Sequence, residues 1–285
     1  MTEGLEALRD WCGSTRESVD IVSAGAVAEL SATLDYDTTL AGEGELLPPC
    51  WHWLFFHEPV PTLALDKDGH PQRGGFLPPV PLPRRMWAGG RLRFHAPLLV
   101  GQVLQRVSTV TDVTAKTGRS GDLVFVTVNH TYSVGDTLCI EERQDIVYRG
   151  ESGRKNTPAQ EASAPAFDFA REVIPGPVTL FRYSALTFNS HRIHYDSDYA
   201  VNVEGYPGLV VQGPLTATFL LDLLCREVPG QVVRAFEFRG LGPLFASEPV
   251  TLGGRRDSTG VELNALNAQR ALSMTARAEF ESSGA

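Results

Sequence analysis

The sequence contains few cysteines and no long apolar run. The four cysteines lie far apart and form no pair with metal-ligand spacing, so we expect reduced thiols and no cysteine-based metal site. No apolar run approaches the ~20 residues that a membrane-spanning helix needs. The first residues also lack a basic start followed by an apolar stretch, the pattern of a secretory signal. These absences predict a cytoplasmic protein with no membrane partner.

Lysine is scarce as well, and the charge is unevenly distributed. The chain has 34 acidic against 25 basic residues, a formal charge of −9, which argues against a nucleic-acid partner. Only three of the basic residues are lysines, and no carboxylate occurs between Asp68 and Asp112. That stretch carries six arginines: Arg73, Arg84, Arg85, Arg91, Arg93 and Arg106. Arginine suits phosphate and carboxylate oxygens, so the stretch indicates either an anion-binding site or a solvated face.

The length of 285 residues and the hydrophobic share of 42% predict one large globular domain or two of middling size. Residues 150–177 are rich in Ala, Ser, Pro and Gly and lack an apolar period, which is typical of a linker. We therefore expect a first domain over residues 1–149, a linker over 150–177 and a second domain over 178–285.

Apolar spacing in the first half predicts one helix followed by strands. Val27, Leu30 and Leu34 share a helical face, whereas the proline-punctuated residues 48–97 cannot form a regular helix. Alternating and β-branched residues predict three strands, at 101–113, 123–134 and 138–149, with a hairpin turn at 118–122.

The second half repeats this plan. Residues 178–186 resemble a strand, and residues 213–226 form a helix that opens with Gly-Pro and is apolar on nearly every side, so we expect it to be buried. Further strands are predicted at 232–242, 249–256, 261–268 and 272–280. A buried helix wrapped by an antiparallel sheet, twice over, is an α+β arrangement.

The densest polar cluster spans residues 187–196, and three interpretations remain open. Asn189, His191 and His194 could perform acid–base chemistry, since histidine transfers protons near neutral pH and asparagine can orient water. His191, His194 and Asp196 could instead bind a metal, although the sequence completes no typical zinc set. The loop could also simply satisfy its own hydrogen bonds.

A glycine-rich approach, residues 205–214, follows this cluster and leads into the apolar helix. Free amides at a helix start, aided by the helix dipole, polarise a carbonyl oxygen. The Gly213 amide is therefore a candidate oxyanion donor for an acyl thioester, although Gly213 could merely begin the helix.

Several long motifs carry a resemblance to a known family. They are PPCWHWLFF, FLPPVPLPRRMWAGGRLRFHAPLLVG, GRSGDLVFVTVNHTY and EERQDIVYR in the first half, and RYSALTFNSHRIHYD and YPGLVVQGPL in the second. From about Pro48 onwards the chain resembles the MaoC-like hydratases, in particular hydroxyacyl-thioester dehydratase type 2 and the related 3-methylfumaryl-CoA (mesaconyl-C4-CoA) and itaconyl-CoA hydratases. The resemblance implies a double hot-dog fold, in which two long helices are each wrapped by a curved sheet and the active site lies at their junction.

The family's hydratase motif carries over residue by residue. Its histidine falls on His194, its oxyanion donor on Gly213, and its acidic residue on Asn189, which cannot act as a base. Either His194 works with Asn189 as a water-positioning group, or His191 takes the second role. Gln212 stands where related sequences tend to have histidine, a difference that bears on substrate preference.

The resemblance implies a hydratase acting on a short enoyl-CoA, with no cofactor and no metal. We expect Arg192, Arg84 or Arg85 to bind CoA phosphates or a free carboxylate of a five-carbon dicarboxylic acyl group, with Arg192 nearest the substrate because it lies within the polar cluster. We expect Gln212 and Tyr195 to contact the substrate as well. Two alternatives remain: a 3-hydroxyacyl-thioester dehydratase acting on an acyl carrier protein, and a non-catalytic acyl-CoA-binding subunit. A homodimer is compatible with each of these.

Overall fold

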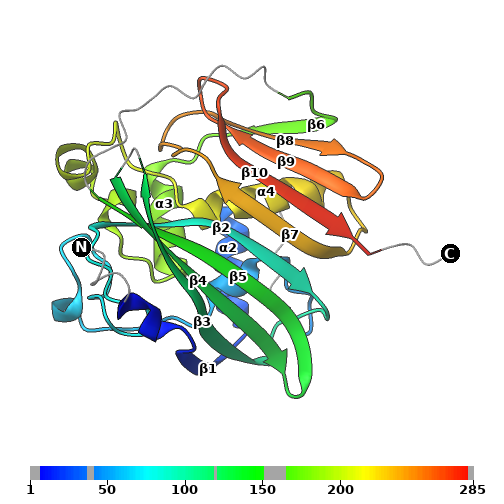
Figure 1. The fold of residues 1–285 in the computed structure, drawn as a ribbon. Helices are drawn as coiled ribbons and strands as arrows, with labels where there is room; N and C mark the ends of the chain where they lie inside the picture. The colour runs from blue at the N-terminus through cyan, green and yellow to red at the C-terminus, as the bar shows by residue number, and fades with distance from the viewer. Residues whose placement is uncertain (1–6, 37–41, 119–120, 151–164, 282–285) are drawn as a thin grey trace.

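The computed structural model describes residues 7–36, 42–118, 121–150 and 165–281, and these residues build one antiparallel sheet of ten strands (Figure 1). The strands of the first half are β1 (Thr15–Ile21), β2 (Arg84–Phe94), β3 (Val103–Gly118), β4 (Gly121–Val134) and β5 (Thr137–Arg149). Those of the second half are β6 (Phe169–Val173), β7 (Val233–Gly240), β8 (Val250–Arg256), β9 (Gly260–Leu266) and β10 (Leu272–Phe280).

The strand order shows that the two halves share one topology. The order across the sheet is β1-β3-β4-β5-β2-β7-β10-β9-β8-β6, so each half has the same order and the two halves meet through their second strands. At that junction β2 and β7 run antiparallel, with Leu92 opposite Phe236, and both side chains are buried. The sheet therefore continues across the middle of the molecule, and one hydrophobic core includes residues of both halves. This arrangement is the double hot-dog fold that the resemblance implied.

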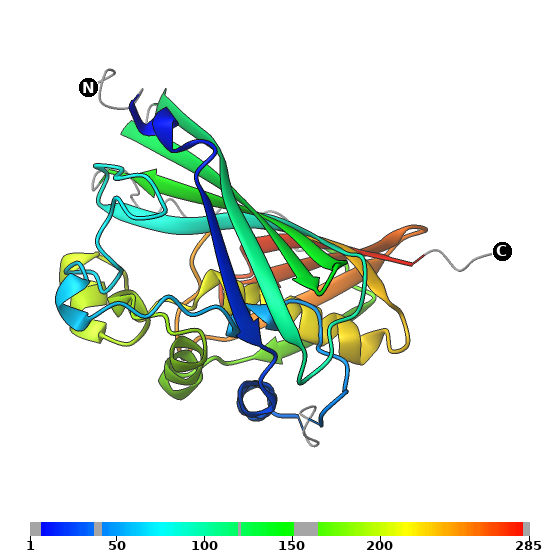
Figure 2. The same ribbon diagram turned by 90° about the horizontal axis from the view of Figure 1, so that it is seen from below.

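The α-helices of the described residues are α2 (Ala24–Thr33), α3 (Pro177–Leu186) and α4 (Gly213–Glu227), and they lie on the same side of the sheet (Figure 2). Every residue of α4 from Leu215 to Leu224 is buried, as its apolar composition predicts. The first-half helix is confirmed by α2, but it spans only ten residues and is not long.

Two features of the second-half prediction require correction. Residues 178–186 form helix α3 rather than a strand. Gly176 and Pro177 begin this helix, because proline fixes a helical φ and lacks the amide hydrogen that a first turn leaves unpaired. Its buried residues Leu180, Tyr183 and Ser184 then follow a helical spacing. In addition, β6 (Phe169–Val173) lies inside the predicted linker of residues 150–177, of which residues 151–164 lie outside the described residues.

The remaining strand predictions agree with the structure. The three first-half strands correspond to β3, β4 and β5, and the four second-half strands correspond to β7, β8, β9 and β10. The turn expected at 118–122 falls partly outside the described residues. Strand β2 was not predicted, because its double arginine and double glycine mask the alternation of a strand.

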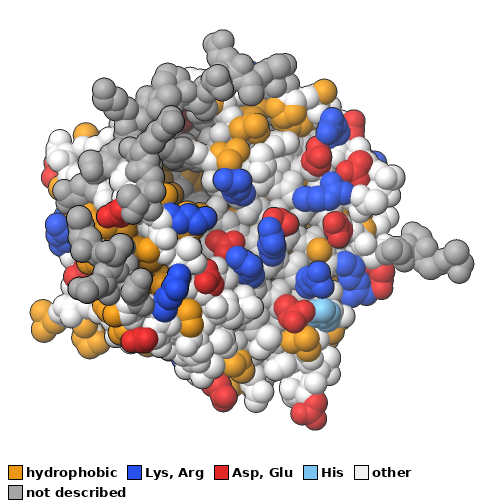
Figure 3. Space-filling model, in the orientation of Figure 1, with side chains coloured by type: hydrophobic (Ala, Val, Ile, Leu, Met, Phe, Trp, Pro, Cys, Tyr) orange, Lys and Arg blue, Asp and Glu red, His pale blue; other side chains and the backbone are white. Residues whose placement is uncertain are grey.

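The outer face of the sheet carries interspersed positive and negative side chains (Figure 3). Ion pairs on it include Arg91 with Glu237 and Arg255 with Glu262. No helix among the described residues is long and apolar enough to cross a membrane.

Candidate active site

A cavity of about 1090 Å³ is lined by residues from both halves of the chain. Eight of the nine predicted site residues line it: Arg84, Arg85, Asn189, His191, His194, Tyr195, Gln212 and Gly213. The structure therefore brings the polar loop after α3, the start of α4 and the double arginine of β2 to one place.

His194 is held in a defined protonation state inside this cavity. It lies on a short 3₁₀ turn (Arg192–His194), and its Nδ1 lies 2.7 Å from the carbonyl oxygen of Val210. A carbonyl oxygen only accepts hydrogen bonds, so Nδ1 carries the hydrogen and Nε2 keeps a free lone pair. Burial lowers the pKa of His194 to about 4, against the opposing effect of the Val210 hydrogen bond. His194 is therefore a neutral imidazole at neutral pH with a lone pair available to accept a proton.

His191 packs edge-on against His194, with ring centroids 5.3 Å apart. Burial and the neighbouring histidines lower the pKa of His191, so this ring is also neutral. The side-chain oxygen of Asn189 accepts the backbone amide of His191 at 3.1 Å. Asn189 thus shapes the loop that presents His191.

The first turn of α4 offers an amide to the cavity. The Gly213 amide donates to no acceptor among the described residues, as expected for the first position of a helix. Beside it, the Gln212 side chain donates to the carbonyl oxygen of Leu180 and to Ser184 Oγ, both at 2.9 Å. Gln212 Oε1 is buried without a partner in the described part of the chain. The helix start therefore combines a free donor with the positive end of the helix dipole.

The two adjacent arginines of β2 differ in their partners. Arg84 forms an ion pair with Glu204 at 3.1 Å and donates to the carbonyl oxygen of the same residue at 3.0 Å. Arg85 pairs with no carboxylate in the described ranges, yet its positive charge lowers the pKa of both His70 and His191. Arg85 is thus an uncompensated cation next to the histidines.

Arg192 does not line the cavity, unlike the other predicted site residues. Its Nη2 lies 2.7 Å from Asp196 Oδ2, its Nη1 donates to the carbonyl oxygen of Lys67 at 3.0 Å, and its guanidinium lies over the ring of Tyr199. Proximity in sequence suggested that Arg192 is the arginine nearest the substrate. In the structure these three contacts hold its guanidinium outside the lining of the cavity.

An acidic–histidine pair that the sequence did not predict lies at the site: His70 lines the cavity, and Asp68 is bonded to it. Asp68 and His70 belong to a hairpin of the first half, and the His70 ring packs on His191 with centroids 4.2 Å apart. Neither residue has a motif signature. The only sequence signal is that Asp68 marks the edge of the acid-free stretch.

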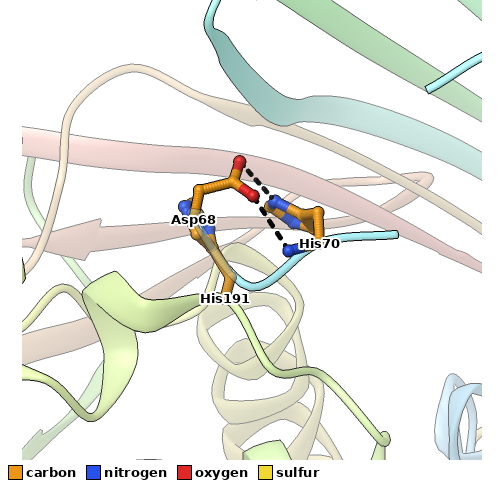
Figure 4. A group of neighbouring side chains, drawn as sticks. All are labelled: Asp68, His70 and His191. Atoms are coloured by element: carbon orange, nitrogen blue, oxygen red, sulfur yellow. Dashed lines mark hydrogen bonds and ion pairs between the residues drawn. The ribbon is translucent and has the colours of Figure 1, made fainter. Parts of the chain in front are cut away.

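The metal set considered from the sequence, His191, His194 and Asp196, is not a group with close donor atoms among the described residues, and Asp196 is paired with Arg192. Within the described ranges, the one group of three potential ligands with close donor atoms is Asp68, His70 and His191, whose atoms lie within 4.8 Å of one another (Figure 4).

Comparisons with known proteins agree with this architecture. The family model for hydroxyacyl-thioester dehydratase type 2 matches residues 50–246. A mesaconyl-C(4)-CoA hydratase from Chloroflexus aurantiacus is 44% identical over 95% of this chain and 96% of its own. A mitochondrial hydroxyacyl-thioester dehydratase type 2 from Schizosaccharomyces pombe is 32% identical over 82% of this chain and 87% of its own.

Solved structures support the fold. A MaoC-like dehydratase superimposes with a TM-score of 0.72 at 16% identity, covering 95% of this chain and 99% of the other. A Mycobacterium tuberculosis protein described as having a double hot-dog fold superimposes with a TM-score of 0.60 at 14% identity, covering 94% and 96%. With the family model matching most of its length, the chain belongs to the hydroxyacyl-thioester dehydratase type 2 family.

Proposed function

We propose that the protein is a hydro-lyase that adds water across the double bond of a short, branched dicarboxylic enoyl-CoA such as mesaconyl-C4-CoA. The observation that carries this proposal is the 44% identity, over nearly the whole of both chains, to a mesaconyl-C(4)-CoA hydratase. The cavity supports it with a neutral histidine base, a free helix amide and an uncompensated arginine.

His194 is the proposed acid–base catalyst. Its Nε2 lone pair removes a proton from water while the water oxygen bonds to the β carbon of the enoyl thioester. The π electrons of the double bond move to the α carbon and the thioester oxygen. The imidazolium of His194 then returns the proton to the α carbon, so one water is added and His194 is regenerated.

The Gly213 amide is the proposed donor to the thioester oxygen, where negative charge develops. A preorganised donor of this kind contributes roughly 3 kcal/mol to stabilising the transition state. The dipole of α4 adds to this effect, because its positive end lies at the same point.

Arg85 is the proposed partner of the free carboxylate. In mesaconyl-C4-CoA that carboxylate is attached to the β carbon, where the water adds, so its partner must lie close to the water that His194 activates. Arg85 interacts electrostatically with His70 and His191 and has no carboxylate partner among the described residues. A guanidinium can bind both carboxylate oxygens at once.

A panel of substrates tests this proposal. We expect kcat/KM to be highest for mesaconyl-C4-CoA, lower for crotonyl-CoA, and lowest for long straight-chain 3-hydroxyacyl thioesters, measured by the change in enoyl-thioester absorbance. The family model and the Schizosaccharomyces pombe relative favour a second candidate, a 3-hydroxyacyl-thioester dehydratase. A preference for long chains, or for acyl carrier protein over CoA, would establish that candidate instead.

Replacing Asn189 with aspartate tests whether the loop that presents His191 tolerates a negative charge. Aspartate can still accept the His191 amide, so we expect an unchanged melting temperature. The new negative charge repels a dicarboxylic substrate, and we expect KM for mesaconyl-C4-CoA to rise about fivefold, or ~1 kcal/mol, with little change for crotonyl-CoA. If neither parameter moved for either substrate, Asn189 would lie outside the site.

A further inference from the structure

A hairpin of the first half brings two polar side chains to the loop that carries His191 and His194. In this hairpin the Asp66 amide donates to the carbonyl oxygen of His70 at 2.7 Å, and the Gly69 amide donates to that of Asp66 at 2.9 Å. These bonds close a tight turn over residues 66–70, with Asp68 near its tip.

Several contacts fix the hairpin against the motif loop. The Arg192 amide donates to the carbonyl oxygen of Asp68 at 2.8 Å, and Ser190 Oγ donates to that of Gly69. Gly69 has a φ of +90°, and a Cβ there would lie 1.9 Å from the carbonyl oxygen of Ser190. Only glycine allows this approach, so the sequence of the turn is adapted to hold the hairpin on the loop.

Within the hairpin, Asp68 determines the state of His70. Its Oδ2 lies 3.0 Å from His70 Nδ1, and its Oδ1 accepts the His70 amide at 2.9 Å (Figure 4). Burial alone would raise the pKa of Asp68, but the hydrogen bond and charge of His70 outweigh it and hold this pKa well below its usual value. Asp68 is therefore an ionised acceptor, so His70 Nδ1 carries the hydrogen and Nε2 keeps a lone pair.

The hairpin and the loop thus present two imidazoles that each carry hydrogen on Nδ1 and a lone pair on Nε2. His194 is fixed by the Val210 carbonyl and His70 by the Asp68 carboxylate, and both rings pack on His191. His70 lines the cavity together with His194, and a positive charge on His70 lowers the pKa of His194. The two rings therefore share one cavity and one neighbour, His191, and the charge of one ring affects the other.

We propose that Asp68 and His70 form a second acid–base pair, which supplies from the first half of the chain what Asn189 lacks. This inference rests on the proposed hydratase function. The Nε2 atoms of His70 and His194 each accept one hydrogen of the same water. His194 removes its proton as the oxygen bonds to the β carbon and later delivers that proton to the α carbon, while His70 holds the other hydrogen, which remains on the new hydroxyl.

The charges around His70 are consistent with this role. Burial lowers the pKa of His70, the Asp68 hydrogen bond and charge raise it, and Arg85 and Arg73 lower it further. Because Asp68 favours positive charge on the ring, it makes His70 a stronger hydrogen-bond acceptor for the water.

Asp68→Asn is the sharpest variant, since it keeps the shape and the bond to the His70 amide but removes the charge. We expect kcat for mesaconyl-C4-CoA to fall about 100-fold with little change in KM, and the acid limb of the kcat–pH profile to move to lower pH. The matched control is Asp66→Asn, which removes an exposed carboxylate from the same turn and should stay within about twofold of the wild type. His70→Gln leaves Asp68 in place and should lose about as much activity as Asp68→Asn.

A second readout needs no substrate. The nitrogen chemical shifts of labelled histidines should show His70 hydrogenated at Nδ1 in the wild type, and this preference should be lost in Asp68→Asn. A His70 ring hydrogenated at Nε2 would overturn the inference, whatever the protein catalyses.

An active wild type with an equally active Asp68→Asn variant would overturn the inference alone, whereas a wild type that hydrates no enoyl-CoA would overturn the proposed function. The proposed acid–base pair would also be contradicted if Asp68, His70 and His191 bound one metal ion and a chelator abolished activity.

Discussion

Replacing His194 with glutamine is expected to lower kcat for mesaconyl-C4-CoA by about 100-fold or more, the usual range for losing a general acid–base group. Glutamine can still donate to the Val210 carbonyl, so the loop keeps its internal bond and the loss reports on proton transfer. Initial rates of enoyl-thioester loss, with circular dichroism to verify folding, measure the effect.

The control for this variant is His95→Gln. His95 is exposed, pairs with Glu141 on the sheet surface and does not line the cavity, so its replacement should leave kcat unchanged. A folded His194→Gln protein with wild-type turnover would show that another group is the base.

The pH profile provides a further check on His194. A base must be unprotonated to accept a proton, so activity that depends on His194 is present above its pKa and lost as the pH falls through it. Because burial lowers this pKa to about 4, the rise in kcat/KM controlled by His194 should lie near pH 4 rather than near the ordinary histidine value.

Replacing Arg85 with glutamine is expected to cost about 2–4 kcal/mol in kcat/KM for mesaconyl-C4-CoA, roughly a 30- to 700-fold loss, as for breaking a buried charge-assisted pair. Crotonyl-CoA lacks the second carboxylate, so its kcat/KM should change little. The ratio of the two substrates therefore isolates carboxylate binding from general damage to the site.

Two neighbouring arginines are controls with different expected patterns. Arg192 supports the loop through Asp196 and Lys67, and Arg84 is paired with Glu204, so Arg192→Gln and Arg84→Gln should affect both substrates alike. Equal losses on both substrates for Arg85→Gln as well would contradict the dicarboxylate assignment.

Local patterns predicted most of the fold, because strand alternation and helix composition depend on near neighbours. The apolar run after Gly213 predicted a buried helix, and α4 is one. Helix α3 was mistaken for a strand because its apolar and aromatic residues suit either element, and the helical start at Gly176 and Pro177 decided between them.

The predicted site came from residues 189–213 and from Arg84 and Arg85 of the acid-free stretch, whereas the rest depends on contacts between distant segments. The hairpin that carries Asp68 and His70 joins the motif loop across 121 residues of sequence, between Gly69 and Ser190, and no local pattern reports such a contact. The same limit explains why the sequence placed Arg192 next to the substrate, since its partners include the carbonyl oxygen of Lys67, which is distant in sequence. Position next to His191 indicated a substrate contact, but the direction of a side chain on a 3₁₀ turn depends on the segments that pack around it.

The central claim, that this protein adds water to a dicarboxylic enoyl-CoA, is tested most directly with oxygen-labelled water. Purified wild-type protein and the His194→Gln variant are incubated with mesaconyl-C4-CoA in this water, and the products are analysed by mass spectrometry. The account predicts a CoA thioester heavier by one labelled water in the wild-type reaction, with the label on the β-carbon hydroxyl, and at least ~100-fold slower formation with His194→Gln. Unchanged mesaconyl-C4-CoA, or release of free CoA with the label in a carboxylate, would contradict it.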